Sequence, residues 1–301
     1  MSNTDNNSMS NCANCGKGEE ENDGLKACTA CKMVKYCNRD CQIAHRSQHK
    51  KECRKRAKEI HDETLFKPPP KLDCPICFIR LPSKQSGTIY KSCCGKKICC
   101  GCLHASAKAV GHLSLCPFCR APAPTREESL KREKKRVEVG DSQAIHNLAC
   151  SYDDGSRGFP RDQAKAVNLW KQAGERGCAS SFFNVARAYR LGEGVARDVK
   201  KERHYYELAA MAGHIGARHD LGVLEEESGN IDRAIKHFLI SASFGDIDSL
   251  NAIREMFRVG YVAKDVYEKA LTSRQAYLDE IRNDDRDNAA AVDRNYIYYE
   301  E

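Results

Sequence analysis

Cysteine and histidine residues near the N-terminus follow the spacing of metal ligands. They form the patterns C-x2-C, C-x2-C, C-x3-C and H-x3-C between residues 12 and 53. The eight candidate ligands are Cys12, Cys15, Cys28, Cys31, Cys37, Cys41, His49 and Cys53. Thiolate and imidazole suit Zn²⁺, which takes four such ligands in a tetrahedron. Eight ligands therefore predict two zinc sites.

A second cysteine cluster follows between residues 74 and 119. It contains the segments CPIC, SCCGKKICCGC and CPFCR. Its candidate ligands are Cys74, Cys77, Cys93, Cys94, Cys99, Cys102, Cys116 and Cys119. Only Cys150 and Cys178 lie after this cluster. Both stand among apolar residues with helical spacing, so we expect buried thiols.

The N-terminal segment predicts the compartment in which these cysteines work. Its first eleven residues, MSNTDNNSMSN, are polar and expected to be disordered, with no apolar stretch of the kind a secretory signal needs. No run of 18 apolar residues occurs, so we expect no transmembrane helix. A reducing cytoplasmic or nuclear compartment is therefore expected, where paired cysteines bind metals more often than they form disulfides.

The formal charge of +7 invites a nucleic-acid interpretation. Zinc-bound cysteines are thiolates, however, and fifteen of them with four Zn²⁺ ions contribute a charge that cancels this excess. Part of the Lys and Arg excess can thus balance zinc–thiolate centres. We therefore expect neither nucleic acid nor a membrane surface as a partner.

Helices and linkers must position the ligands. The segment Cys41–Phe66 contains neither Gly nor Pro, so it predicts a helix on which His49 and Cys53 share one face. FKPPPK (Phe66–Lys71) would end this helix and act as a stiff spacer. Arg126–Arg136 predicts a charged linker helix with a solvated face, or alternatively a basic patch for nuclear localisation or an acidic partner.

A helical repeat follows the cysteine clusters. Three stretches align with one another and close on Gly177, Gly213 and Gly245. Each has a helix, a turn and a second helix, and the fourth, degenerate unit resembles a terminal cap. This periodicity predicts an α-solenoid. Trp170, Tyr206 and Phe238 occupy equivalent positions and are expected to pack between hairpins. The tail from about Arg282 is expected to be frayed.

The first cluster resembles the MYND zinc finger in its order C-x2-C, C-x2-C, YC-x3-CQ, H-x3-H-x3-C. The resemblance implies interleaved ligation, with Cys12, Cys15, Cys37 and Cys41 on one zinc and Cys28, Cys31, His49 and Cys53 on the other. It favours His49 over His45 as the ligand. Such fingers commonly bind Pro-containing peptides, but Arg46 stands where the family frequently has Trp.

The second cluster resembles a RING finger of the all-cysteine type. The resemblance implies one site of Cys74, Cys77, Cys99 and Cys102, and a second of Cys93, Cys94, Cys116 and Cys119. Lys96 replaces the usual ligand after the central C-G. His104 or His112 could replace one of the two adjacent cysteines, and Cys100 is interpreted as a non-ligand.

RING fingers hold no nucleophile or general base, and they act by positioning a ubiquitin-charged conjugating enzyme. The resemblance assigns the contacts with that enzyme to Ile76, Pro117 and Arg120. Arginine suits the last position because its planar fork donates to two partners at once. No catalytic residue of the chain itself is predicted. A metallo-hydrolase is disfavoured, because a catalytic zinc needs an open coordination position.

The repeats resemble the Sel-1-like class of tetratricopeptide-like hairpins, best in AYRLGEGV and AAMAG of the second unit. LGEGV (Leu191–Val195) joins two helices and lacks the Lys-Ser/Thr of a phosphate-binding loop. Solenoids of this class typically bind peptides or other proteins.

The predicted architecture is two small cross-brace zinc fingers followed by an all-α solenoid. Its parts are a disordered segment (1–11), a MYND finger (12–53) with a helical extension to 66, a Pro-rich linker (67–73), a RING-like finger (74–120), a charged linker (121–137), Sel-1-like repeats (138–275) and a tail (276–301). We expect a zinc-binding adaptor with four zinc ions that acts as a RING-type ubiquitin ligase, its repeats recruiting substrate. The alternatives are a non-enzymatic scaffold and a transcriptional cofactor.

Overall fold

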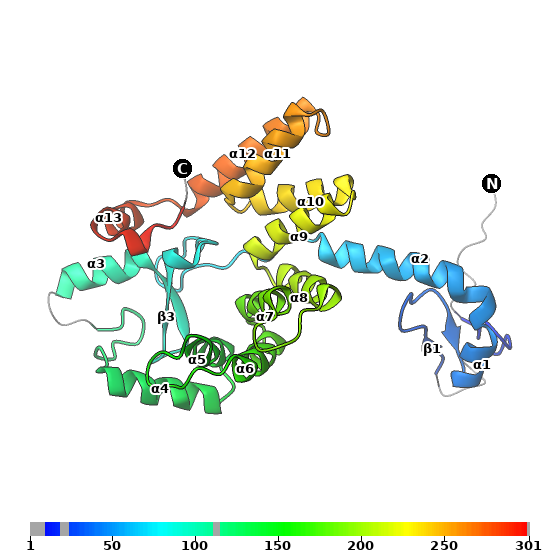
Figure 1. The fold of residues 1–301 in the computed structure, drawn as a ribbon, viewed down its shortest axis with the longest axis horizontal. Coiled ribbons are helices and arrows are strands. Elements are labelled where there is room, and N and C mark those ends of the chain that lie inside the picture. Colours follow the sequence, from blue (N-terminus) through cyan, green and yellow to red (C-terminus); the bar gives the residue numbers. More distant parts are fainter. Residues whose placement is uncertain (1–9, 19–23, 111–114, 300–301) are drawn as a thin grey trace. The chain divides into compact units, whose positions relative to one another are not determined.

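The computed structural model describes residues 10–18, 24–110 and 115–299 (Figure 1). The chain divides into two compact units, Met1–Lys67 and Pro68–Glu301. The second unit contains both the RING-like segment and the helical repeats. Among the described residues, no helix is long and apolar enough to cross a membrane.

The first unit is a small zinc-finger fold with a cysteine core. Strands β1 (Lys26–Ala27) and β2 (Lys35–Tyr36) pair antiparallel, and helices α1 (Arg39–Ala44) and α2 (Arg46–Leu65) follow. The predicted helix is therefore present but breaks at His45. Asn38 caps α1 by accepting a hydrogen bond from the backbone N–H of Cys41. The buried residues of this core are Cys12, Cys28, Cys31 and Tyr36.

The second unit begins with the Pro-rich segment. Pro69 is buried and lies against the turn at Gly213, so the predicted spacer contacts the helical array. The 3₁₀ turn η2 (Gln85–Gly87), the antiparallel hairpin β3 (Thr88–Lys91) and β4 (Lys96–Cys99), and helix α3 (Cys100–Val110) follow. Ile98 of β4 is fully buried among the cysteines of this finger.

Nine helices make up the array that follows, in the described part of the chain. They are α4 (Arg126–Glu138), α5 (Ser142–Asp154), α6 (Gln163–Glu175), α7 (Ala179–Leu191), α8 (Val199–Met211), α9 (Ile215–Glu227), α10 (Ile231–Ala242), α11 (Ile247–Arg258) and α12 (Lys264–Ile281). The pairs α5–α6, α7–α8 and α9–α10 pack as hairpins, as the repeat predicts.

Small and aromatic residues pack the hairpins together. Trp170, Tyr206 and Phe238 are buried, which confirms their predicted role in packing. A Cβ atom at Gly222 would lie 2.4 Å from a ring carbon of Phe238, so only glycine lets this ring approach the helix so closely. Cys178 is buried, as predicted, whereas Cys150 is only half-buried.

Helix α4 is more than a charged linker. Thr125 and Glu128 form a capping box at its start, and most of its charged side chains are exposed as predicted. Glu133, however, is buried and forms an ion pair with Arg157. Helix α4 therefore packs on the array as its first helix.

The expectation of a frayed tail is wrong. Helix α13 (Asp284–Val292) and the 3₁₀ turn η3 (Arg294–Tyr296) pack against the RING-like finger, with α13 beside α3 (Figure 1). Arg286 and Tyr298 are fully buried. The tail is too polar for its sequence to predict this burial. The surface against which it packs comes from a segment about two hundred residues earlier in the chain. Residues 300 and 301 lie outside the described part.

Both ends of the helical array hold the RING-like finger. At one end, the Tyr90 hydroxyl donates to Asp141, the N-cap of α5, at 2.8 Å. At the other end, the Tyr277 hydroxyl on α12 accepts a hydrogen bond from the Ser83 N–H at 2.7 Å. The finger is thus built into the array.

Buried histidines make the array sensitive to acid. Burial, aided by Lys97, lowers the pKa of His146 to about 4, while an unfolded chain protonates histidine near pH 6.5. Between these values the unfolded state binds the extra proton, so stability falls as the pH drops from 6.5 to 4. The wild type should lose unfolding free energy between pH 7 and 5.5, and His146→Gln should lose about 1 kcal/mol less than the wild type. Urea unfolding at the two pH values measures this, and equal losses in variant and wild type would contradict it.

Candidate metal centres

The structure gathers sixteen cysteine and histidine side chains into four groups of four. Within each group the ligand atoms lie within 4.8 Å of one another. The groups are Cys12, Cys15, Cys37 and Cys41; Cys28, Cys31, His49 and Cys53; Cys74, Cys77, Cys99 and Cys102; and Cys93, Cys94, Cys116 and Cys119. These groups match the interleaved pairing that the two family resemblances imply.

The sulfur separations fit zinc and do not fit disulfides. Four sulfurs at a Zn–S distance of about 2.3 Å would lie about 3.8 Å apart, whereas a disulfide needs about 2.05 Å. The separations run from 3.3 Å for Cys37–Cys41 through 3.6 Å for Cys15–Cys37, 3.7 Å for Cys28–Cys53 and 3.8 Å for Cys77–Cys99 to 3.9 Å for Cys74–Cys102 and Cys94–Cys116. The donor sets therefore suit tetrahedral zinc.

The two histidines of the first unit have different surroundings. His49 Nε2 lies 3.2 Å from Cys31 Sγ, inside the second group. His45 lies outside this group, and its Nδ1 is 3.1 Å from the Tyr36 hydroxyl. The two rings stack with centroids 5.8 Å apart. His45 thus packs beside the group, and His49 faces the other ligands.

The adjacent cysteines of the RING-like finger face the same centre. Cys119 Sγ lies 3.4 Å from Cys93 Sγ, and Cys94 Sγ lies 3.9 Å from Cys116 Sγ. His104 is not part of any of the four groups among the described residues, and His112 lies outside those residues. Cys100 is fully buried against residues of the C-terminal segment, away from the four groups.

Four of the five C-x2-C pairs form the same backbone turn, and each ligand group contains one of these four. The residue after the second cysteine has a positive φ in each: Gly16 (75°), Lys32 (55°), Phe78 (58°) and Arg120 (57°). The N–H of that residue donates to the carbonyl of the first cysteine at 2.8 to 2.9 Å in every case. A left-handed conformation costs energy for a residue other than glycine, so its use by three such residues indicates that the ligand geometry requires this turn. The fifth pair, Cys99 and Cys102, leads into helix α3 instead.

This turn favours the thiolate of its first cysteine. Burial raises the pKa of Cys12, of Cys28 and of Cys116, but the N–H groups of the turn outweigh it and lower these pKa values to about 6, 6 and 7. The Cys99 thiol, together with N–H groups, lowers the pKa of Cys74 to about 4. Hydrogen bonds to the charged form stabilise it, which prepares a ligand for metal binding.

Two arginines of the helical array face the RING-like centres, and sequence reasoning missed both. Arg136 on α4 donates to the carbonyls of Ser92 and Cys93, at 3.2 Å each. Arg286 on α13 reaches Cys77 Sγ at 3.9 Å. No local motif marks either residue, because each acts across the tertiary fold. The excess of Lys and Arg in the sequence was the one available signal that basic residues could lie beside the ligand groups.

The three residues assigned to the conjugating enzyme lie on two of these turns. Ile76 is half-buried and packs on the cysteine core, Pro117 is half-buried and Arg120 is exposed. Phe78 is 78% exposed and Phe118 is 44% exposed on the same two turns. Both phenylalanines were missed from the sequence.

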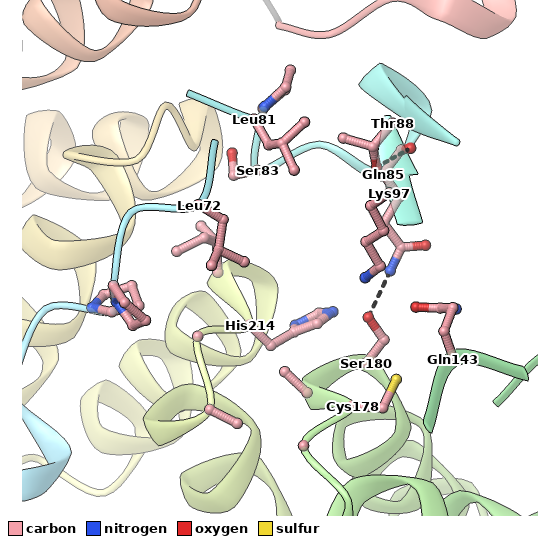
Figure 2. A pocket seen from close by; sticks show the side chains of 18 of the residues that line it. Leu72, Leu81, Ser83, Gln85, Thr88, Lys97, Gln143, Cys178, Ser180 and His214 are labelled. Atoms are coloured by element: carbon pink, nitrogen blue, oxygen red, sulfur yellow. Dashed lines mark hydrogen bonds between the residues drawn. The ribbon is translucent and has the colours of Figure 1, made fainter. Parts of the chain in front are cut away.

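A cleft of about 910 Å³ separates the RING-like finger from the starts of the repeat helices. Figure 2 shows Gln85, Thr88 and Lys97 of the finger facing Gln143, Ser180 and His214 of the array. The Gln85 side-chain amide donates to Ser180 Oγ at 3.0 Å across the cleft. Leu72 and Leu81 add apolar surface. The mixture of apolar and polar groups suits a protein segment.

Comparison with known families places two modules in the chain. The family model of the MYND finger matches residues 12–53. The model of the Sel1 repeat matches residues 142–178 and 181–214. Both matches coincide with the modules described above.

Two curated proteins are similar to part of the chain. One is an ERAD-associated E3 ubiquitin-protein ligase component, HRD3B, of Arabidopsis thaliana, 30% identical over 37% of this chain. The other is chitin synthase regulatory factor 2 of Schizosaccharomyces pombe, 28% identical over 28% of this chain. The chain spans 17% of the length of each relative.

Solved structures with similar chains include a Sel1 repeat protein from Oxalobacter formigenes, which is 22% identical with a TM-score of 0.40 over 53% of this chain and 67% of that one. A protective antigen of uropathogenic Escherichia coli with an SLR fold is 24% identical, with a TM-score of 0.43 over 55% of this chain and 36% of that one. From the family models, residues 12–53 of this chain are a MYND zinc finger, and residues 142–178 and 181–214 are Sel1 repeats.

Proposed function

We propose that this chain is a zinc-binding adaptor that acts as a RING-type ubiquitin ligase and recruits its substrate through the repeats. The observation that carries this proposal is that the ligand atoms of the irregular group, with its adjacent Cys93 and Cys94, lie within 4.8 Å of one another, as in the other three groups. A RING-like finger with two complete sites would then present both of its ligand-bearing turns in a fixed geometry.

Such a finger catalyses transfer by positioning the ubiquitin-charged conjugating enzyme. Zinc in these closed four-ligand sites is structural and supplies no activated water. Ile76 and Pro117 would dock on the conjugating enzyme, with the exposed Phe78 and Phe118 beside them. Arg120 would donate to both the enzyme and ubiquitin, which would hold the thioester ready for attack.

The substrate would bind in the cleft between the finger and the repeats. A segment held there would lie next to the finger that positions the conjugating enzyme, within the same compact unit. Binding beside the transfer site raises the effective concentration of the acceptor. The name of the Arabidopsis relative connects a similar sequence with a ubiquitin ligase, which supports this proposal.

A non-enzymatic scaffold is the second candidate. The Schizosaccharomyces pombe relative is named as a regulatory factor of chitin synthase, and its name implies no ubiquitin transfer. In that case the zinc sites would only shape surfaces that bridge proteins.

Zinc stoichiometry tests the four sites. We expect elemental analysis to find one zinc for each of the four ligand groups. Cys94→Ser should lose one ion, because it removes a ligand of the fourth group. Cys100→Ala is the matched control, since Cys100 lies outside the groups, and it should lose none. A wild-type protein with one ion fewer would mean that the Cys93–Cys94 site is broken, and with two fewer, that the RING-like finger binds no zinc.

Self-ubiquitination with a panel of conjugating enzymes tests the ligase activity. We expect Ile76→Ala to slow chain formation about tenfold or more, because a central apolar contact is lost. Val139→Ala, at an exposed apolar residue outside the finger, is the control and should keep full activity. Chain formation with no enzyme of the panel, or with equal rates in Ile76→Ala and wild type, would reject the ligase and leave the scaffold.

Filling the cleft tests substrate recruitment. Ser180→Trp places a large ring at the start of α7, inside the cleft, and should abolish binding of partners that copurify with the wild type. Leu191→Trp, at the exposed end of the same helix, is the control and should retain them. Quantitative affinity purification compares the three proteins. Undiminished partner recovery with Ser180→Trp would place the binding surface elsewhere.

A further inference from the structure

Arg286 of α13 is a fully buried arginine at the first ligand group of the RING-like finger. Its Nη1 donates to the carbonyl oxygens of Arg80 at 2.8 Å and of Ile281 at 2.6 Å. Its Nη2 lies 3.3 Å from the carbonyl oxygen of Ile79 and 3.9 Å from Cys77 Sγ. The guanidinium thus joins the first turn of the finger to the end of the helical array.

The buried positive charge of Arg286 needs a negatively charged partner. No carboxylate of the described residues forms an ion pair with it, and its Nε has no hydrogen-bond partner. A buried guanidinium without a counter-charge costs several kcal/mol, roughly, because it loses its hydration. Four thiolates around Zn²⁺ carry a net charge of −2. The sulfur of Cys77, one of these four ligands, faces this guanidinium at 3.9 Å.

The surrounding packing brings the two parts unusually close. A Cβ atom at Gly101 of α3 would lie 2.8 Å from the backbone nitrogen of Arg286, so only glycine fits there. Glu280 on α12 pairs with Lys71 and with the buried Arg80. The rings of Phe244 and Tyr277 lie 4.5 and 4.7 Å from the Arg80 guanidinium. The C-terminal segment therefore covers the back of the first ligand group.

We propose that Arg286 is the counter-cation of the zinc–thiolate centre formed by Cys74, Cys77, Cys99 and Cys102, and that α13 docks on the finger only when this centre holds zinc. The inference rests on the zinc site of the proposed function but not on ligase activity. Zinc occupancy would then control whether the end of the repeat array is attached to the finger. Because coupling is reciprocal, docking of α13 also slows zinc loss.

Zinc release from individual sites tests the role of the charge. The holoprotein is treated with a chelator and a thiol-alkylating reagent, and mass spectrometry follows the alkylation of each cysteine. We expect Arg286→Gln to speed alkylation of the four cysteines of this centre 10- to 100-fold, the usual effect of losing an outer-shell partner. The MYND cysteines are an internal reference and should not change. Arg282→Gln, which removes an exposed arginine four residues earlier, is the matched control and should match wild type.

A conservative variant separates charge from packing. Arg286→Lys keeps the positive charge but loses the planar fork, so it should release zinc more slowly than Arg286→Gln. A purely structural crosslink predicts equal effects of Lys and Gln, since neither reproduces the arginine contacts. Equal rates for the two variants, or a wild-type rate for both, would overturn the proposal.

Hydrogen exchange of the wild-type protein tests whether docking of α13 depends on zinc, and it needs no substitution. In the holoprotein, the amides of α13 should be protected, and they should lose protection together with zinc at Cys74, Cys77, Cys99 and Cys102. Protection of α13 that survives removal of all zinc would overturn the proposal. If elemental analysis finds no zinc in the RING-like finger, the proposed function fails as well. If zinc is present there and the Arg286 variants behave like wild type, only this inference fails.

Discussion

Zinc–thiolate bonding is the interaction on which both cysteine-rich regions depend. The buried residues of the MYND core are three cysteines and one tyrosine, and the finger core of the second unit is also mostly cysteine. Such segments bury too little apolar surface to offset the entropy of ordering their chains. Metal binding supplies the missing free energy. The left-handed turn that recurs after one C-x2-C pair in every ligand group shows how strictly the backbone must then follow its ligands.

The charge of these centres explains features that hydrophobic packing does not. A tetrathiolate zinc site is anionic, and a protein interior tolerates a net charge only beside an opposite one. Arg136 on α4, the first helix of the array, and Arg286 on α13, which follows the array, reach the two groups of the RING-like finger. The array and the C-terminal segment therefore do more than display a binding surface. They place positive charge beside the finger, which the cleft separates from the starts of the repeat helices.

The sequence predicts the parts of this protein whose signals are local. Cysteine spacing gives the candidate ligands, and the family resemblances that rest on it give the four ligand groups. The glycines at 177, 213 and 245 give the hairpin period, and the absence of Gly and Pro gives the helix that bears His49. Arg286, Tyr298 and the cleft could not be predicted, because their partners lie far away in the chain. The polar composition of α13 even predicted the opposite outcome. Phe78 and Phe118 went unnoticed because a single exposed apolar residue carries no periodic signal.

The contact between Cys77 and Arg286 spans 209 residues of sequence. A chain made from its N-terminus presents all eight MYND ligands early, whereas Arg286 leaves the ribosome only after the repeats. The MYND finger can therefore load its metals while translation continues. The ligands of the RING-like finger also precede the repeats, but the contact with α13 cannot form until every repeat has been made. Closing such a long loop is slow, so this contact sets a late step in maturation. A chain that stops short of α13 would carry every finger ligand and still lack a finished finger.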